Sequence, residues 1–433
     1  MTFIHYDEAK RAASDAVKDW VQNDPKVERA LLVSDLFGKF RLVLWGLSDS
    51  VDESKQTLQP KLEGVCGHWW TGEILLASEA GEAHKSIWST AWNQARLHSD
   101  EPRFGTLDRH RTRTAWFADA DDPLWLTPDN GPPIIVFYSF KGGLGRSTTL
   151  ASFAIQRARA GERVCVIDFD LDSPGIGCVL SADEKGLTSP WGVVDYLLER
   201  AQGDVPISDY HHTCVRVAGP GVITVFPAGT LDAEYADKLA RVDLDEPPSA
   251  HASGLAHLLN DIRAAINPDW ILLDARTGIS EPAGQLLSGL AHLHVLLGTT
   301  SEQSWQGLKR VLDRLGRDRV VKNRPQSDIL LVQAMVPPTA ETAHRATEAF
   351  AERARQEFTE WYYAMEPEDP ADDNFWDVRD LDSADAPHVP IALPYEPRLA
   401  DFRDIAEIAD YLCEREYAVI AERIGGHFEQ EPQ

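Results

Sequence analysis

Residues 134–149 read Ile-Ile-Val-Phe-Tyr-Ser-Phe-Lys-Gly-Gly-Leu-Gly-Arg-Ser-Thr-Thr, and this stretch decides the fold. The apolar run 134–138 predicts a buried strand, and the pattern of 148–160 predicts a helix behind it. Between them, glycines let the backbone curl so that successive N–H groups point at one anion. The N-terminus of the helix adds a partial positive charge at the same place. The stretch therefore predicts a phosphate-binding loop at the end of a strand.

The residue types in this loop favour a nucleotide-binding loop. The alternative is a glycine-rich turn that binds no ligand. Arg146 brings a full positive charge, and Ser147 offers a hydroxyl of the kind that coordinates Mg²⁺. Strand, glycines, cation and hydroxyl occur in the order that a nucleotide loop needs. We expect the nucleotide-binding residues to be Gly142, Gly143, Leu144, Gly145, Arg146, Ser147 and Thr148.

Two further apolar runs end in carboxylates. Residues 164–175 run from a predicted strand into the alternating Asp168, Asp170 and Asp172, and residues 269–278 contain Asp274 after a second run. In a parallel sheet, ligands lie beyond the carboxyl ends of the strands. Carboxylates at that edge can bind a hydrated metal ion or accept a hydrogen bond from an attacking water. A solvated acidic loop is the alternative interpretation.

The glycine loop resembles the deviant Walker A motif, KGGxGK[ST]T, of the MinD/ParA/nitrogenase-iron-protein class of P-loop ATPases. Two positions depart from it, because Arg146 replaces the motif lysine and Phe140 replaces the glycine that opens the general P-loop pattern. The form SFKGGLGRS resembles the variant branch known as KGGVGR. Arginine keeps the charge on a broader, planar donor, so we expect binding to survive the change. The effect on the rate of hydrolysis stays open.

The resemblance implies roles for individual residues. Lys141 matches a lysine that reaches a partner's nucleotide across a dimer interface; an ordinary exposed lysine is the alternative. Asp168 and Asp170 match the switch I motif, which implies Asp168 near the water shell of the metal and Asp170 orienting or deprotonating the attacking water. Asp274 matches Walker B and would hold Mg²⁺ together with Ser147.

Two more positions match the class by place rather than by motif. Arg276 stands in the turn after Asp274, where relatives more often have a proline. It could contact phosphate or pair with one of the nearby acids, and the sequence does not decide between these. Gln333 ends the run 329–332, where relatives place a base-reading Asn, and it could hydrogen-bond adenine.

The pattern along the chain predicts two domains. Residues 1–120 read as an N-terminal α+β accessory domain whose many tryptophans either fill a core or form a partner-binding face. Residues 121–133, rich in Asp and Pro, read as a linker. In residues 134–425, short apolar runs alternate with helical stretches, which predicts a doubly wound, mostly parallel α/β sheet. The runs are 134–138, 164–167, 222–226, 270–273, 294–297, 329–332 and 389–392, with an acidic insertion at 366–385.

Composition excludes several classes of protein. The net charge of −27 over 433 residues argues against wholesale binding to DNA or anionic lipid. One basic stretch, 309–324, could contact DNA or form a solvated helix face. The five cysteines form no CxxC pair, so neither a zinc site nor a disulfide scaffold is indicated. With no signal peptide and no apolar run of membrane length, we expect a cytoplasmic protein without a membrane partner.

Together these features predict an Mg²⁺-dependent ATPase that acts as an ATP-controlled dimerisation switch. The resemblance implies slow turnover that waits for a partner. The alternative is a non-hydrolysing nucleotide-binding scaffold whose Trp-rich N-terminal domain recruits a partner. The loop of this chain also resembles variant loops that occur in proteins of bacterial conflict and signalling operons. The resemblance therefore implies antiphage defence as an expected setting.

Overall fold

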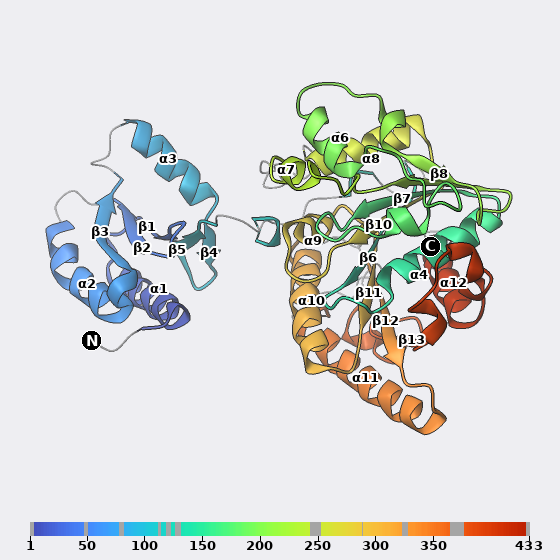
Figure 1. Ribbon diagram of the computed structural model, residues 1–433. Helices are drawn as coiled ribbons and strands as arrows, with labels where there is room; N and C mark the ends of the chain where they lie inside the picture. Colours follow the sequence, from blue (N-terminus) through green and yellow to red (C-terminus); the bar gives the residue numbers. More distant parts are fainter. Residues whose placement is uncertain are drawn as a thin grey trace. The chain divides into compact units, whose positions relative to one another are not determined.

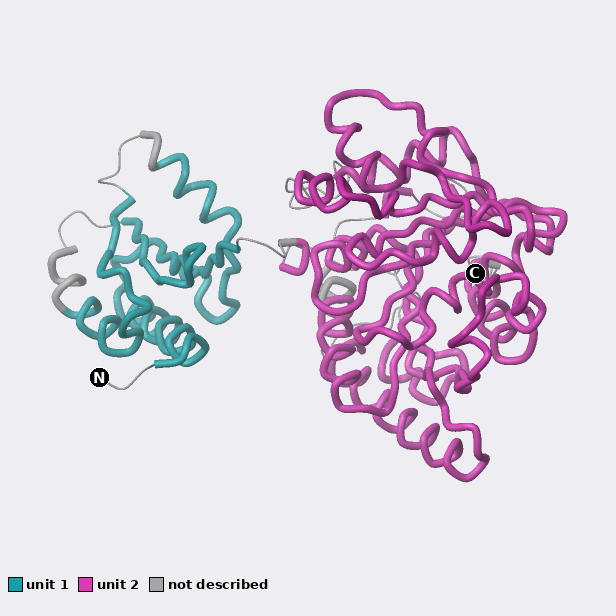
Figure 2. Tube along the Cα trace, viewed as in Figure 1, with its two compact units in different colours: residues 1–112 teal, residues 113–433 magenta. Residues whose placement is uncertain are grey.

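The computed structural model describes residues 4–46, 51–77, 82–110, 114–117, 123–125, 131–242, 253–287, 289–322, 328–363 and 376–429. The chain divides into two compact units, residues 1–112 and 113–433 (Figures 1 and 2). Residues 121–122 and 126–130 of the predicted linker lie outside the described residues. Within the described ranges, no helix has the length and hydropathy needed to cross a membrane.

The N-terminal unit is a five-stranded mixed sheet with helices on both faces. Its strands lie in the order β3 (Trp70–Leu76), β2 (Phe40–Trp45), β1 (Arg29–Ser34), β5 (Glu101–Asp108) and β4 (Arg96–His98). β1 runs antiparallel to β2 and parallel to β5. Apolar side chains of α1 (Tyr6–Asn23) and α2 (Val51–Cys66) pack on one face of the sheet, and those of α3 (Glu82–Asn93) pack on the other.

The tryptophans of this unit pack against its hydrophobic cores, and within the described residues three of them also contact other aromatic rings. Trp70 is buried, and Trp45 meets Trp92 edge to face with ring centroids 5.6 Å apart. Trp69 packs against Tyr6 at 5.3 Å. Large aromatic rings contribute much of the buried area of a small core. Core filling, the first of the two alternatives above, describes these rings.

The C-terminal unit is built on an eight-stranded sheet. Every pair of neighbouring strands is parallel except β8 and β9 at one edge. The order is β13 (Ile391–Pro394), β12 (Asp328–Val336), β11 (Leu293–Gly298), β6 (Ile134–Ser139), β10 (Trp270–Ala275), β7 (Arg163–Phe169), β9 (Val222–Phe226) and β8 (His212–Cys214).

Helices cover both faces of this sheet (Figure 1). β6 shows why, because Ile134, Val136 and Tyr138 enter one core while Ile135 and Phe137 enter the other. A strand buried on both faces reads as a continuous apolar run, which confirms the predicted doubly wound sheet. One face packs against α4 (Arg146–Arg159) and α12 (Arg415–Glu429). The other packs against α6 (Val193–Arg200), α8 (Gly254–Ala265), α9 (Glu281–Leu286), α10 (Glu302–Lys322) and α11 (Ala340–Trp361).

The C-terminal part departs from the predicted elements in two places. The last strand begins at Ile391 instead of residue 389, and Pro390 just before it has no N–H to donate to a strand ladder. The sequence pattern of 401–423 predicts a helix, but the helix begins only at Arg415, because short 3₁₀ turns occupy 405–407 and 411–413. Residues 366–375 of the acidic insertion lie outside the described residues.

Candidate nucleotide site

The loop between β6 and α4 has the backbone that its glycines permit. Gly143 and Gly145 have φ of 76° and 83°, in the left-handed region that side chains rarely adopt. Gly145 is the N-cap of α4 and has no side chain that could cap the helix. The amides at the start of α4 therefore receive no hydrogen bond from a side chain of this residue. Such uncapped amides can bind an anion.

Phe140 explains how the loop tolerates its unusual first residue. Its ring packs against Gly307 of α10, where an added Cβ would come within 1.9 Å of the ring. A glycine on the neighbouring helix thus provides the space for the aromatic ring. The sequence could not reveal this pairing, because the two residues lie on elements far apart in the chain.

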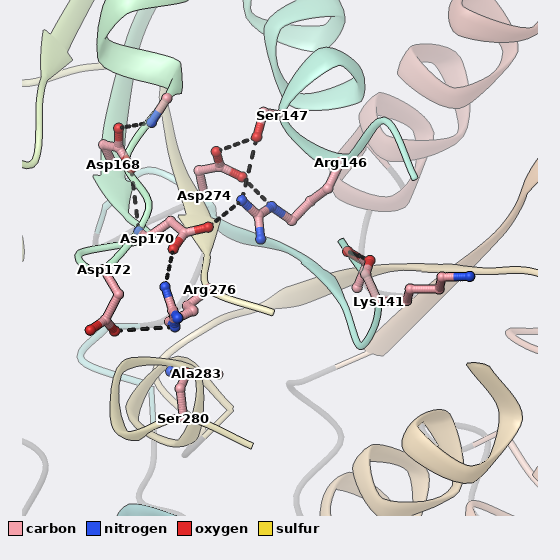
Figure 3. Close-up of polar contacts among 12 residues, drawn as sticks. Lys141, Arg146, Ser147, Asp168, Asp170, Asp172, Asp274, Arg276, Ser280 and Ala283 are labelled. Atoms are coloured by element: carbon pink, nitrogen blue, oxygen red, sulfur yellow. Dashed lines mark hydrogen bonds and ion pairs between the residues drawn. The ribbon is translucent and has the colours of Figure 1, made fainter. Parts of the chain in front are cut away.

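Four predicted site residues converge beside the loop (Figure 3). The Arg146 guanidinium donates from Nε to Asp274 Oδ1 at 2.6 Å and from Nη2 to Asp170 Oδ2 at 2.9 Å. The Ser147 hydroxyl donates to Asp274 Oδ2 at 2.6 Å. α4, β10 and the end of β7 supply these groups, and β10 lies between the parallel β6 and β7. The sheet topology therefore brings together residues that are more than 120 positions apart.

The charged groups of this cluster are buried, so each of them needs a partner of opposite charge or a hydrogen bond. Arg146 is 8% exposed and Asp274 is 1% exposed. Burial raises the pKa of Asp274, while Arg146 and Ser147 oppose that rise. The third guanidinium nitrogen, Arg146 Nη1, is buried and has no hydrogen-bond partner among the described residues. A buried donor without a partner is costly, so this nitrogen is a ready contact for an acceptor oxygen.

Arg276 pairs with carboxylates, which answers the question that the sequence left open. It donates from Nη1 to Asp170 Oδ1 at 3.2 Å, and its Nε lies 3.1 Å from Asp172 Oδ2 (Figure 3). Both carboxylate oxygens of Asp170 are therefore bound by arginines, Arg146 on one side and Arg276 on the other. Asp170 lies between the two cations.

Asp168 contacts the cluster through the backbone of Asp170, whose N–H donates to Asp168 Oδ1 at 3.3 Å, whereas the Lys141 side chain lies apart from it. The Asp168 carboxylate accepts backbone N–H groups from Gly175 at 3.0 Å and Gly177 at 3.3 Å, within its own loop. Burial, reinforced by the charge of Asp274, raises the pKa of Asp168 to about 7. Lys141 is exposed, and its ammonium points away from Arg146 and the carboxylates (Figure 3).

Gln333 lies at the same edge of the sheet, two strands from β6. Register places it opposite Gly298 of β11, one step beyond the row that contains Ser139 at the end of β6. Its Nε2 donates to the carbonyl oxygen of Ala346 at 3.0 Å. Its Oε1 is buried and has no partner among the described residues. The side chain therefore offers one unpaired hydrogen-bond acceptor.

The donor set fits a magnesium ion that arrives with a nucleotide. The Ser147 hydroxyl and the Asp274 carboxylate are hard oxygen ligands, and they already lie against a cation, the Arg146 guanidinium. Mg²⁺ is usually held by one or two carboxylates together with substrate phosphates.

One contact near the site was not foreseen. Trp116, at the end of a short 3₁₀ turn, donates from Nε1 to the carbonyl oxygen of Ser280 at 2.6 Å. The Ala115 N–H donates to Glu281 Oε1 at 3.1 Å. The turn thus binds the start of α9, a few residues after Arg276. No local signal could have revealed a partner 164 residues away.

The chain is similar to known nucleotide-binding proteins in sequence and in fold. The model of the CobQ/CobB/MinD/ParA nucleotide binding domain family matches residues 135–351. The iron-sulfur cluster carrier protein of Salmonella typhimurium is 41% identical over 59 residues, which span 14% of this chain and 16% of that relative.

Solved structures resemble the chain over a larger share at low identity. The pNOB8 ParA bound to nonspecific DNA is 16% identical, with a TM-score of 0.47, over 69% of this chain and 99% of that one. The MinD cell division protein of Aquifex aeolicus is 17% identical, with a TM-score of 0.43, over 70% and 99%. The Mg-ADP complex of Pyrococcus horikoshii MinD is 16% identical, with a TM-score of 0.41, over 69% and 96%. With its glycine loop, carboxylates and sheet in the order described, the chain belongs to the CobQ/CobB/MinD/ParA nucleotide-binding domain family of P-loop proteins.

Proposed function

We propose that this protein binds ATP with Mg²⁺, hydrolyses it slowly, and uses ATP to control pairing with a second copy of itself. The observation that carries the proposal is the hydrogen-bonded cluster of Arg146, Ser147, Asp170 and Asp274 beside the glycine loop. These residues combine a cation, a metal-ligand pair and a carboxylate that can accept from water.

Nucleotide binding would use both ends of this sheet edge. The loop amides and Arg146 would receive the phosphates, because they are the donors on this side. Gln333 would receive the base, since two strand spacings amount to roughly 10 Å from β6. Its unpaired Oε1 is an acceptor, which matches the amino group of adenine and opposes the carbonyl oxygen of guanine. This supports ATP over GTP.

Hydrolysis would depend on releasing Asp170. In the proposal, Ser147 and Asp274 hold Mg²⁺, which when bound would neutralise charge on the phosphates. Asp170 would accept a hydrogen bond from the attacking water, but Arg146 and Arg276 bind both of its oxygens. One of these pairs must open before Asp170 can accept from water. This requirement supports slow turnover.

Lys141 supports the pairing of two copies. Its exposed ammonium points away from its own cluster, so it is available to phosphate bound elsewhere (Figure 3). A cation contributed by a second molecule stabilises the charge that develops on a transferring phosphoryl group. The same lysine would link the dimer to the reaction.

A phosphate-release assay on two matched variants tests hydrolysis. Asp170→Asn removes the negative charge and basicity of the carboxylate proposed to accept from water, and Asp172→Asn removes the other carboxylate that pairs with Arg276. We expect Asp170→Asn to lower turnover by about 100-fold or more while ATP still binds, and Asp172→Asn to have little effect. Equal release by the wild type and both variants would instead favour the alternative function, a non-hydrolysing scaffold.

The oligomeric state tests the dimer. We expect light scattering to show a dimer of the Asp170→Asn protein with ATP and Mg²⁺, and a monomer without them. Adding Lys141→Ala should abolish the dimer, whereas Lys185→Ala, at another exposed lysine of the same unit, should not. An oligomeric state that ignores nucleotide in all of these proteins would contradict the proposed switch.

The proposed setting is a bacterial conflict or antiphage defence system in the cytoplasm. It rests on the resemblance of the loop at residues 139–147 to variant loops from such operons. The N-terminal unit would then contact a protein partner, since it lies outside the residues that the family model matches.

A further inference from the structure

A cavity of about 500 Å³ opens in the N-terminal unit between α1 and the sheet. Four of its lining residues alternate along two parallel neighbours, Leu32 and Ser34 on β1 and Thr106 and Asp108 on β5. Alternation places all four side chains on the same face of the sheet. The volume falls within the range of about 300–1,000 Å³ that is typical of small-molecule sites.

The cavity lies where parallel strands end. Ser34 and Asp108 are the last residues of β1 and β5 and pair with each other in register. In open sheets, ligands bind in the crevice beyond the carboxyl ends of such strands. A second hollow of about 250 Å³ shares these two residues and continues towards Tyr6 and Gly38. The concave surface therefore extends along this edge of the sheet.

The cavity is positively charged on an acidic protein. Lys10, Arg11 and Arg96 line it, against a single carboxylate, Asp108, so its formal net charge is +2. Asp108 is itself bound by Lys10 at 2.7 Å. Burial lowers the pKa of the lining residue His98, which disfavours a further positive charge on this ring. A positively charged cavity on a chain with a net charge of −27 favours the binding of an anion.

The remaining lining residues describe the rest of the ligand. The apolar side chains of Leu32, Phe40 and Leu97 provide surface for a ring or hydrocarbon body. The hydroxyls of Ser14, Ser34, Ser99 and Thr106 supply hydrogen bonds. A phosphate monoester carries a charge near −2 at neutral pH, which balances the cavity. Arginine forks also match the geometry of phosphate oxygens.

We propose that this cavity binds a small organic phosphate, with the phosphate group held by Arg11 and Arg96 and the organic body against Leu32 and Leu97. The site is separate from the nucleotide site, because every residue that lines it belongs to the N-terminal unit. The protein thus has a second anion site with its own ligand.

Isothermal titration of the full chain with phenyl phosphate tests this site. We expect Arg96→Glu to weaken binding by at least about tenfold, because it removes one cation and adds an anion. Asp108→Asn should instead tighten binding, since it removes the opposing carboxylate and releases Lys10. Lys26→Glu, an equal charge change at an exposed position of the same unit outside the cavity, should leave binding unchanged.

Hydrogen–deuterium exchange of the same proteins locates the ligand. We expect phenyl phosphate to protect residues 6–23 and 96–108, and inorganic phosphate to do so more weakly because it lacks an organic body. Protection of residues 141–149 alone would assign the binding to the nucleotide loop and overturn the proposal. Wild-type protein that does not bind, equal affinities of all variants, or weaker binding by Asp108→Asn would also overturn it.

Discussion

Arg146 organises the candidate site through the shape of its guanidinium. Its Nε and Nη2 reach two different carboxylates at once, those of Asp274 and Asp170. An ammonium is a compact point charge, whereas the planar fork fixes the directions of its donors. The arginine in the place of the motif lysine therefore does more than preserve a charge. It fixes the relative positions of the two acids.

Removing this guanidinium should destabilise the C-terminal unit. In Arg146→Ala, the buried Asp274 loses its cation, and breaking a buried pair costs about 3–5 kcal/mol. We expect urea unfolding to show a loss of this size at neutral pH. The loss should shrink in acid, because a protonated carboxyl group needs no counter-charge.

Arg276→Ala is the matched control for that loss. It removes pairs to Asp170 and Asp172, but the Arg276 side chain is 30% exposed to solvent. Partly exposed pairs contribute about 1 kcal/mol or less. Equal losses in the two variants would show that the Arg146 cluster is not held by its buried charge.

Asp168 should give the protein a specific dependence on pH. Its pKa is about 7 in the folded chain against a normal value of 3.8. Between these values the folded chain binds a proton that the unfolded chain lacks. The stabilisation from this group is therefore present at low pH, is lost as pH rises towards 7, and changes little above that.

Urea unfolding of the wild type and Asp168→Asn from about pH 5 to about pH 8 checks this dependence. The free energy of unfolding of the wild type minus that of the variant should fall as pH rises. Titrating groups that do not interact with Asp168, including the buried His292 and His294, are shared by both proteins and cancel in the difference. A difference that stays constant with pH would contradict the raised pKa of Asp168.

Among the elements, the sequence predicts those strands and helices whose bounds are set by neighbouring residues. The apolar patterns of 29–34, 40–45 and 222–226 predict strands, and the strands have these bounds, because each is a short apolar run between turns. Helix α4 follows its loop as expected. The direction of the Arg146 side chain and the contact of Trp116 with Ser280 depend on partners more than 100 residues away. No periodicity in one sequence carries that information.

The packing of α10 against the glycine loop leads to a further prediction. In Gly307→Ala, the new Cβ would lie 1.9 Å from the Phe140 ring, so the helix or the start of the loop must move. Overpacking of this kind costs about 1–3 kcal/mol. We expect reduced thermal stability together with weaker ATP binding, measured by calorimetry on the same protein.

Gly426→Ala provides the control for this substitution. Gly426 also lies in a helix, α12, but nothing would lie within 4 Å of its added Cβ. Alanine there should stabilise by about 1 kcal/mol through helix propensity. Adding Phe140→Ala to Gly307→Ala should restore much of the lost stability. If it does not, the clash with the ring is not the cause.

At the scale of the whole molecule, charge separates two kinds of partner. The basic stretch 309–324 is less available to DNA than its sequence suggests, because Lys309 pairs with Glu357 at 3.2 Å and Arg314 is buried. Side chains of 317–324 lie outside the described residues. A chain with a net charge of −27 also repels DNA and, equally, a second copy of itself.

Salt should therefore act in opposite directions on the two associations. Binding to DNA through cationic side chains releases counterions, and raising salt from about 50 mM to about 200 mM lowers the entropy gained by that release, so DNA binding should weaken steeply. The same change screens repulsion between two acidic chains, so we expect the ATP-dependent dimer to tighten. Sedimentation of the Asp170→Asn protein with ATP and Mg²⁺, with and without a short DNA duplex, measures both effects. A dimer that weakens as salt rises would mean that attractive charge pairs, such as Lys141 with phosphate, outweigh the overall repulsion. DNA binding that withstands salt would contradict the electrostatic argument against a nucleic-acid partner.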